Sequence, residues 1–169
     1  IQAMIEFATE GCTRQDLLQH LQSVSPSAKK STLATQLNAL IAEWGALKAH
    51  GDEFILTPRG EAFLESGDVD EVVDWMITKI LGFDNLLHAL SREPMTNRDA
   101  ISFLRGVNPG WTKDFAPSSL IWWLRSLQLV QLTGKLLSLT ERGARWASLI
   151  HWTPRGLSGR VGAVLVDHP

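Results

Sequence analysis

The stretch that decides the fold is Leu56-Thr-Pro-Arg-Gly60, which the chain repeats as Leu139-Thr-Glu-Arg-Gly143, 83 positions further on. When the whole chain is shifted by 83 positions without a gap, 13 identical residues align between residues 1–66 and 84–149. A gapless match of that length indicates that the chain consists of two copies of one unit. We therefore expect two similar domains of about 66 residues each, with a connecting segment between them.

Composition narrows the class of protein. The 169 residues are 44% hydrophobic and 20% charged, which is ordinary for a globular chain. The single cysteine, Cys12, excludes an internal disulfide and a cysteine-based zinc site. The sequence has no run of about 18 apolar residues and no signal-peptide pattern, so we expect a cytoplasmic protein without membrane association. Because the chain opens at Ile1 and carries no catalytic-looking module, we also expect it to be part of a larger protein.

The net charge of −2 conceals a difference between the two copies. Residues 1–67 carry five Lys and Arg against eight Asp and Glu, a net charge of −3. Residues 84–150 carry eight against five, a net charge of +3. Residues 68–83, between them, carry one against four. A polyanion such as DNA would therefore be attracted to the second copy rather than to the first.

Apolar spacing predicts three helices at the start of the first copy. The first helix spans residues 1–9, and a second, short helix starts at the capping-box-like residue Thr13. A third helix has an apolar stripe from Leu33 to Trp44 and stops at Gly45.

A hairpin and a closing helix complete the unit. Two short apolar runs, 46–48 and 53–56, surround a Gly-containing connection, which is typical of a β-hairpin. Thr57 is expected to be the N-cap of a last helix that begins at Pro58 and ends at Gly67. Three helices, a two-stranded wing and a closing helix predict a winged helix-turn-helix with one added helix.

The second copy has the same predicted elements. They are helices over 83–91, 97–106 and 116–127, strands near 129–132 and 136–139, and a closing helix over 141–150. The predicted fold is mainly α with short β-hairpins: two tandem winged helix-turn-helix domains, joined by a connector helix. The predicted divisions are residues 1–67, 68–82 for the connector helix, 83–150, and 151–169 as a linker or C-terminal arm with an extended run from Val161 to Val166.

Enzymatic constellations are absent from the sequence. It has no phosphate-binding Gly-rich loop and no nucleophile elbow, and its five histidines do not fall at metal-ligand spacing. We therefore expect no catalytic activity, no cofactor and no metal.

The third helix of each copy is the candidate DNA reader, because the third helix of a winged helix usually enters the major groove while the wing touches the backbone. Its side chains off the core stripe are small hydroxyls and an amide flanked by cations, which are groups that contact phosphates and base edges. A plain solvent-exposed face is the alternative, since neither helix is strongly basic. The candidate DNA-binding residues are Lys29, Lys30, Thr32, Thr35 and Gln36 in the first copy, and Lys113, Ser118, Ser119, Trp122, Arg125, Lys135, Arg142 and Arg145 in the second.

Trp122 stands out among these residues. It lies beside Trp123, which falls on the apolar stripe, and adjacent helical residues point about 100° apart, so both rings cannot face one core. Its counterpart in the first copy is Ala39. Packing between the copies or under the connector helix is the favoured interpretation. Anchoring a partner or stacking on a nucleic-acid base are the alternatives.

A resemblance to a known family accompanies this pattern. It is carried by the runs Glu65-Ser-Gly-Asp68, Gly82-Phe-Asp84, Val107-Asn-Pro-Gly-Trp111, Trp123-Leu-Arg-Ser-Leu127 and Leu139-Thr-Glu-Arg-Gly143. Together they resemble tandem winged-helix segments of bacterial defence proteins, notably those attached to AAA+ ATPases like the Mcr-type restriction systems. The resemblance covers about residues 55–150 and involves caps, turns and core residues. It implies an accessory, non-catalytic anti-phage module, with an ATPase or nuclease module in the same or another chain.

Two functions follow from the sequence. The first is a module of a bacterial defence, restriction or regulatory protein that binds double-stranded DNA mainly through its basic second copy. The second is a protein–protein docking module of a larger ATPase or chromosome-associated complex. The tandem topology and the basic second copy favour DNA, whereas the acidic first copy and the seven tryptophans favour assembly.

Overall fold

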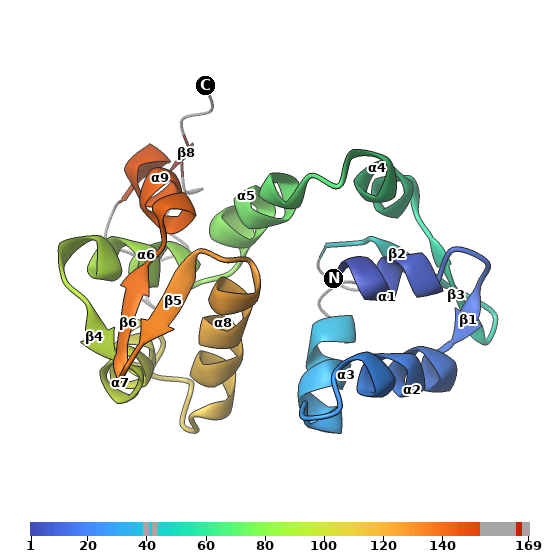
Figure 1. The fold of residues 1–169 in the computed structure, drawn as a ribbon, viewed down its shortest axis with the longest axis horizontal. Coiled ribbons are helices and arrows are strands. Elements are labelled where there is room, and N and C mark those ends of the chain that lie inside the picture. The colour runs from blue at the N-terminus through green and yellow to red at the C-terminus, as the bar shows by residue number, and fades with distance from the viewer. Residues whose placement is uncertain (39–40, 42–43, 153–164, 167–169) are drawn as a thin grey trace. The chain divides into compact units, whose positions relative to one another are not determined.

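The structure is a computed structural model that describes residues 1–38, 41, 44–152 and 165–166. The chain divides into two compact units, Ile1–Val69 and Asp70–Pro169. In its described residues each unit is mainly helical with a small antiparallel sheet, which is consistent with a winged-helix-like fold (Figure 1).

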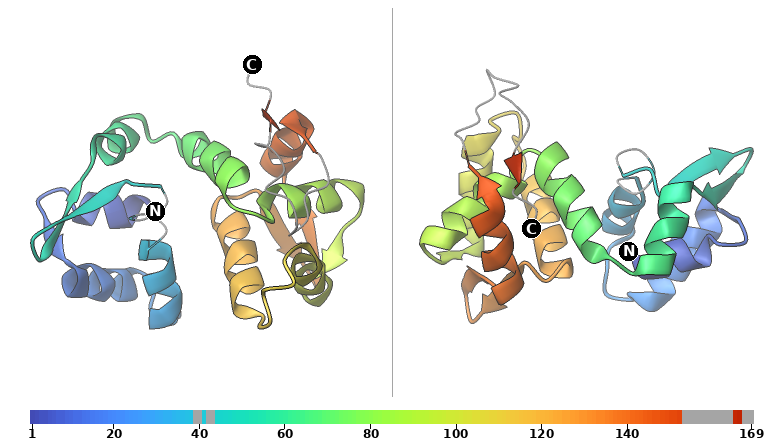
Figure 2. Two further views of the ribbon diagram at one scale, coloured as in Figure 1. Left: turned by 180° about the vertical axis from the view of Figure 1, so that it is seen from behind. Right: turned by 90° about the horizontal axis from the view of Figure 1, so that it is seen from above.

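The first unit places a three-stranded sheet beside its helices. Its elements are α1 (Gln2–Phe7), β1 (Cys12–Thr13), α2 (Arg14–Val24), α3 (Lys30–Asn38), β2 (Leu47–His50), β3 (Glu53–Leu56) and α4 (Pro58–Ser66). The strand order is β1-β3-β2, and both pairings are antiparallel. The hairpin of β2 and β3 reaches out beyond the helices of this unit (Figure 2).

The second unit has the same order of elements, preceded by one more helix. Its elements are α5 (Val69–Lys79), α6 (Phe83–Arg92), β4 (Met95–Thr96), α7 (Asn97–Val107), α8 (Phe115–Ser126), β5 (Val130–Thr133), β6 (Leu136–Leu139) and α9 (Glu141–Leu149). The strand order is β4-β6-β5. A further antiparallel pair, β7 (Ile150–His151) and β8 (Leu165–Val166), follows α9.

Strand pairing repeats with the 83-residue shift found in the sequence. Every residue pair of the first sheet has a counterpart 83 positions later in the second, which confirms the repeat at the level of backbone register. Examples are Cys12 opposite Phe54 and Leu47 opposite Leu56 in the first unit, and Met95 opposite Leu137 and Val130 opposite Leu139 in the second.

The predicted helix caps are confirmed. The hydroxyl of Thr57 accepts a hydrogen bond from the backbone N–H of Gly60 at 3.3 Å, at the start of α4. The hydroxyl of Thr140 accepts one from Gly143 at 3.0 Å, at the start of α9. Each hydroxyl satisfies a helix N–H that has no partner within the helix.

Glycine is required in the first turn of both closing helices. A Cβ atom at Gly60 would lie 2.4 Å from the carbonyl oxygen of Ala46, and one at Gly143 would clash still more closely with that of Leu129. These carbonyls belong to the segments that lead into β2 and β5, so the glycines let each closing helix pack directly against its wing. Close packing is therefore the reason that Gly recurs in the repeated stretch.

The core of each unit lies between the helices and the sheet. In the first unit Trp44 is 1% exposed and packs edge-to-face against Phe63, with ring centroids 5.2 Å apart. The third helix was expected to reach Trp44. Its described part is α3, Lys30–Asn38; Ile41 is again helical, and Trp44 lies in a bend. Residues 39, 40, 42 and 43 of the predicted helix lie outside the described residues. The buried residues of the second unit include Val72, Met76, Phe83, Leu86, Leu87, Leu104, Leu124, Leu129 and Trp146.

A third strand in each sheet was not predicted from the sequence. Strands β1 and β4 are only two residues long, and each ends at a threonine, Thr13 or Thr96, that is also the N-cap of the next helix. Thr13 accepts from the N–H of Asp16 and donates to its carboxylate at 2.6 Å, and Thr96 does the same with Asp99. The sequence around each threonine predicted the start of a helix, so the two-residue strand that ends at the same threonine was missed.

Helix α5 belongs to the second unit from Asp70 onward, whereas the sequence suggested a separate connector over 68–82. Its apolar stripe is buried there, and its first turn contacts α9.

The predicted C-terminal arm, 151–169, is described only in part. Strand β8 covers Leu165–Val166, while the rest of the expected extended run, 161–164, lies outside the described residues.

Candidate nucleic-acid interface

Arg105 organises the loop that leads into α8. Its Nε and Nη2 donate to the carbonyl oxygens of Trp111 and Thr112, both at 3.1 Å, and its Nη1 lies 3.3 Å from a carboxylate oxygen of Asp114. Three contacts from one planar guanidinium fix the path of the loop. Lys113, a predicted DNA-binding residue, is exposed in this loop.

Helix α8 has one exposed face. Its buried side consists of Pro117, Leu120, Ile121, Trp123 and Leu124. The exposed side follows helical spacing from Phe115 through Ser118 and Trp122 to Arg125, and Ser119 beside it is half-buried. The predicted reader positions therefore lie on one side of one helix.

Trp122 is a partly exposed aromatic residue in contact with a buried one. Its ring meets the buried ring of Trp123 edge-to-face, with centroids 5.5 Å apart and planes at 82°. The two neighbouring rings point in different directions, as the sequence required, and Trp122 remains 37% exposed. It is therefore not enclosed in the core of the second unit, and packing between the copies, which the sequence favoured, stays a prediction.

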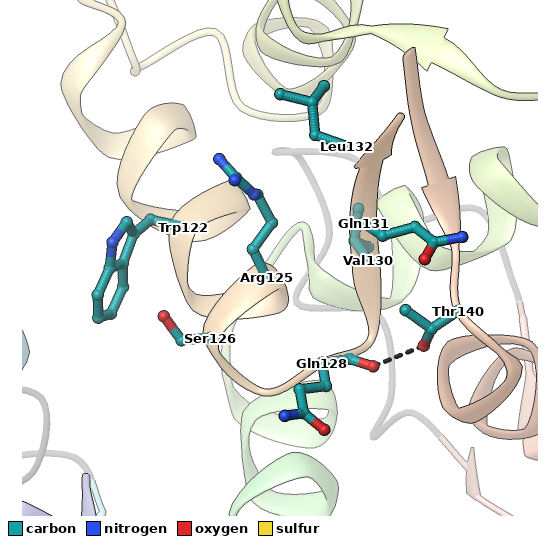
Figure 3. Close-up of a pocket in the computed structure, with 8 residues that line it drawn as sticks. All are labelled: Trp122, Arg125, Ser126, Gln128, Val130, Gln131, Leu132 and Thr140. Carbon is teal, nitrogen blue, oxygen red and sulfur yellow. Dashed lines mark hydrogen bonds between the residues drawn. The ribbon is translucent and has the colours of Figure 1, made fainter. Parts of the chain in front are cut away.

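A shallow groove runs between α8 and β5. It is lined by Trp122, Arg125, Ser126, Gln128, Val130, Gln131, Leu132 and Thr140 (Figure 3). Arg125 projects from α8 on the side of Leu132, while Trp122 extends from the same helix in another direction. Arg125 is exposed and has no carboxylate partner among the residues that the structure describes. Ser126, Gln128 and Gln131 were not among the predicted site residues.

Gln128, which lines this groove, adopts a left-handed backbone conformation. Its φ of 58° is the only positive value found for a non-glycine residue in the described part of the chain. Its carbonyl oxygen accepts a hydrogen bond from the hydroxyl of Thr140, drawn as a dashed line in Figure 3. In the first unit the same bond runs from Thr57 to Gly45, whose φ is 69°. The shift of 83 residues would have revealed this Gly-to-Gln exchange in the sequence.

The wing of the second unit adds one more cation. Lys135 is exposed in the turn between β5 and β6, next to Gly134. Like Lys113 and Arg125, it makes no ion pair within the described ranges. These three cations lie on the helix approach, the helix and the wing.

Arg142 and Arg145 are placed differently from what the sequence suggested. Nε of Arg142 lies 3.2 Å from Oδ1 of Asp70, and Nη2 of Arg145 lies 3.2 Å from Oδ2. The indole Nε1 of Trp146 also donates to Asp70, at 3.1 Å. Partial burial alone would raise the pKa of Asp70, but hydrogen bonds from Arg142 and Trp146 and the charges of both arginines lower it below its ordinary value. Both arginines thus already hold a carboxylate.

The candidate DNA-binding residues of the first unit are less accessible to DNA than those of the second. Lys29 and Lys30 are exposed, and Thr32 and Thr35 are half-buried. The hydroxyl of Thr35 donates to the carbonyl oxygen of Ser31 at 2.9 Å, within its own helix. Gln36 was expected to face DNA, but it is 3% exposed and therefore cannot reach a base edge without rearrangement. It lies between Leu33 and Leu37 on the buried side of α3.

The first unit has a groove of another character. It lies between α2 and α3, where Leu18, Pro26 and Leu33 form an apolar wall with Arg14 and Lys30 beside it. No aromatic residue lines this groove. This groove lies at a different place in the fold from the groove between α8 and β5 of the second unit.

Comparison with known proteins yields one distant likeness. No family model matches the chain, and a search of curated proteins gave no significant match. Among solved structures, the chain is similar to the BpuJ1 endonuclease binding domain in a complex with pyrene- and phenanthrene-modified DNA. The two share 14% identity over 85% of this chain and 76% of that chain, with a TM-score of 0.42. A likeness at this level assigns neither a fold nor a function.

No helix within the described residues is long and apolar enough to cross a membrane. In the same part of the chain, no group of three or more His, Cys, Asp or Glu side chains is arranged to hold a metal ion.

Proposed function

We propose that this chain is a non-catalytic DNA-binding module made of two tandem winged-helix domains. The second unit would make the main contact with double-stranded DNA, with α8 facing the major groove and the β5–β6 hairpin following the backbone. This is the docking geometry that winged helix-turn-helix domains commonly use.

The observation that carries the proposal is the placement of the three unpaired cations. Lys113, Arg125 and Lys135 are all exposed, and no carboxylate neutralises them in the described structure. They stand on the loop before the reading helix, on that helix and in the wing. Phosphates are held mainly by such lysines and arginines, which release condensed counterions when they bind.

Ser118 gives the same face a small polar group. It is exposed on α8 between Phe115 and Trp122. A serine hydroxyl both donates and accepts, so it can contact a phosphate or the edge of a base. Ser119 is half-buried and is therefore the weaker candidate.

The first unit would play a minor part. Its acidic balance repels phosphate, Gln36 is buried, and Lys29 and Lys30 are the cations left near its third helix. We expect these two lysines to support binding rather than to dominate it. Following the sequence resemblance, we further propose that the module serves a bacterial restriction or defence protein.

The test is the binding of a labelled DNA duplex, measured by fluorescence anisotropy over a range of salt concentrations. The double variant Lys113→Glu, Arg125→Glu should lose affinity by orders of magnitude at low salt. The slope of log K against log salt should fall by about two units, because each phosphate contact contributes roughly one.

The matched control is Lys29→Glu, Lys30→Glu, which makes the same charge change in the first unit. It should lose much less affinity. If the isolated chain does not bind duplex DNA even at low salt, or if the first-unit lysines prove dominant, the proposal is wrong.

Protein docking is the second candidate, and one observation favours it. Among the described residues of the second unit, four large apolar side chains are between 37% and 52% exposed: Phe115, Trp122, Leu132 and Leu136. Exposed apolar groups gathered on one helix and one hairpin are a common feature of protein interfaces. In that case the charge-reversal variants would leave partner binding nearly intact, whereas Trp122→Ala would abolish it.

A further inference from the structure

We infer that the groove between α8 and β5 holds an unpaired nucleobase, so that the module prefers DNA with a base outside the helical stack to an intact duplex. This inference rests on the proposed function and specifies its substrate. It concerns Trp122, Arg125 and Gln128, which line the groove (Figure 3).

Trp122 supplies a stacking surface. More than a third of the side chain is exposed, and its contact with the buried Trp123 restrains it. A preorganised ring loses little conformational entropy when a base stacks on it. Stacking on aromatic side chains is the main source of affinity for unpaired bases, because each base has a π face.

Arg125 and its neighbours supply hydrogen bonds. Arg125 and Ser126 follow Trp122 by three and four positions on α8, and all three line the groove, although the Trp122 side chain extends in another direction than that of Arg125. The guanidinium matches the O6 and N7 acceptors of guanine, while the hydroxyl of Ser126 and the amide of Gln128 can both donate and accept. The groove therefore combines a π face with groups suited to a base edge.

The first unit shows that the fold does not need these side chains. The residues 83 positions before Trp122, Arg125 and Gln128 are Ala39, Ala42 and Gly45. Within the described residues, Thr57 and Thr140 make the same cap and the same bond to the preceding loop. Three positions that carry small residues in the first unit thus carry large side chains that line one groove of the second.

The backbone conformation of Gln128 is energetically unfavourable for a residue other than glycine. The left-handed backbone conformation is unfavourable for residues with a Cβ and free of that penalty for glycine, which the first unit uses at this position. Gln128 therefore reduces the stability of the fold and places an amide at the groove. Such a cost is commonly found at binding sites.

An unpaired base fits this groove better than an apolar protein segment does. A protein covering the groove would bury the charge of Arg125, which has no carboxylate partner in the described structure. Lys113, in the loop before α8, and Lys135, in the β5–β6 turn, add exposed positive charge to the same unit. Aromatic residues set among cations are typical of surfaces that bind single-stranded nucleic acid.

The preference for an unpaired base follows from stacking geometry. In an intact duplex the faces of each base are covered by its neighbours, so Trp122 can reach only an edge or the backbone. A base that is bulged or single-stranded presents a free face. The cations hold the flanking duplex in both cases.

The experiment compares three labelled DNAs of equal sequence: an intact duplex, the duplex with one bulged guanine, and the duplex with an abasic residue at the bulge. The abasic bulge keeps the backbone distortion and removes the base. The chain should bind the guanine bulge about 10-fold or more tightly than either other DNA, as expected for one stacked base. Tryptophan fluorescence should fall only with the guanine bulge.

Three variants locate the site. Trp122→Ala should remove the preference for the guanine bulge while retaining duplex binding. Gln128→Gly should raise the melting temperature and reduce the preference several-fold, so it tests the groove with a variant that folds. Phe115→Ala is the matched control, since this aromatic is exposed on the same helix but does not line the groove.

The outcomes separate this inference from the proposed function. If the three DNAs bind equally well, or if the guanine preference survives both Trp122→Ala and Gln128→Gly, the base site is wrong and the duplex-binding proposal stands. If no DNA binds at low salt, both fail. If Trp122 instead mediates binding to a second copy of the chain, the groove is a protein interface and the base site is again wrong.

Discussion

The carboxylate of Asp70, in the first turn of α5, accepts hydrogen bonds from both Nε and Nη2 of Arg142, 72 residues later in α9. Arg145 and Trp146 add two more donors to the same carboxylate. Four donors from one helix thus meet one carboxylate of another. This contact connects the start of α5 to the closing helix of the second unit.

Replacing Asp70 with Asn should therefore destabilise the second unit. The amide keeps the shape but loses the charge-assisted bonds, which we expect to cost about 1 kcal/mol because the group is partly exposed. Urea unfolding monitored by tryptophan fluorescence should show a lower midpoint. Glu93→Gln, at an exposed position with no ion pair in the described structure, should leave the midpoint unchanged.

The same contact should make stability depend on pH. Because the pKa of Asp70 is lowered in the folded state, its contribution is fully present above the unfolded-state pKa, near 4, and is lost as the pH falls through the lower folded-state pKa. The difference in unfolding midpoint between the native chain and Asp70→Asn should be constant from pH 5 to 8 and shrink toward pH 3. A difference that persists at the acid end would show that the charge is not its source.

Local signals made most of the fold predictable. The caps at Thr57 and Thr140, the glycines of the hairpins and the apolar stripes are all properties of short segments, and they located helices and strands to within a few residues. The repeat added long-range information, because each feature could be checked 83 positions away. The short strands β1 and β4 were not predicted, because two residues are too few to show the alternation of a strand.

The site was only partly predictable, for a different physical reason. Exposure of Ser118 and Arg125 followed from the helical face that they occupy, and exposure of Lys113 from its place in the polar loop before α8. The buried state of Gln36 did not, because packing around α3 rather than the residue type decides it. The ion pair of Arg142 with Asp70 joins distant segments, so no spacing rule indicates it.

Gly143 provides a test of the close approach between α9 and the segment before β5. Gly143→Ala places a methyl group against the backbone carbonyl of Leu129, which cannot move aside as a side chain would. We expect destabilisation of about 3 kcal/mol or more, at the upper end for overpacked sites. Thermal unfolding followed by circular dichroism would measure it.

The matched control is Gly106→Ala in α7. A Cβ there meets no atom within 4 Å, and the backbone is helical. Alanine should therefore stabilise the chain by about 0.5–1 kcal/mol. Equal effects of the two substitutions would contradict the close approach at Gly143.

The cap at Thr140 should be more important than a single hydrogen bond implies. Its hydroxyl accepts from Gly143 and donates to the carbonyl oxygen of Gln128, so it connects α9 to the end of α8. Thr140→Ala should cost about 1–2 kcal/mol, whereas Thr140→Ser, which keeps the oxygen, should cost clearly less. Chemical denaturation of both variants decides this, and an equal loss would mean that the methyl group, not the hydroxyl, is responsible.

Arg145 and Lys135 should contribute differently to DNA binding. Arg145 already lies beside Asp70, so a phosphate that approaches it meets a pair with little net charge and releases few additional counterions. Lys135 is exposed in the wing and has no such partner in the described residues. In the salt titration, Lys135→Gln should lower the slope by about one unit, and Arg145→Gln should lower it by clearly less. Arg145→Gln should instead reduce the unfolding midpoint, which Lys135→Gln should not. If Arg145→Gln lowers the slope as much as Lys135→Gln does, the arginine leaves Asp70 to bind phosphate, and the footprint extends along α9 as the sequence first suggested.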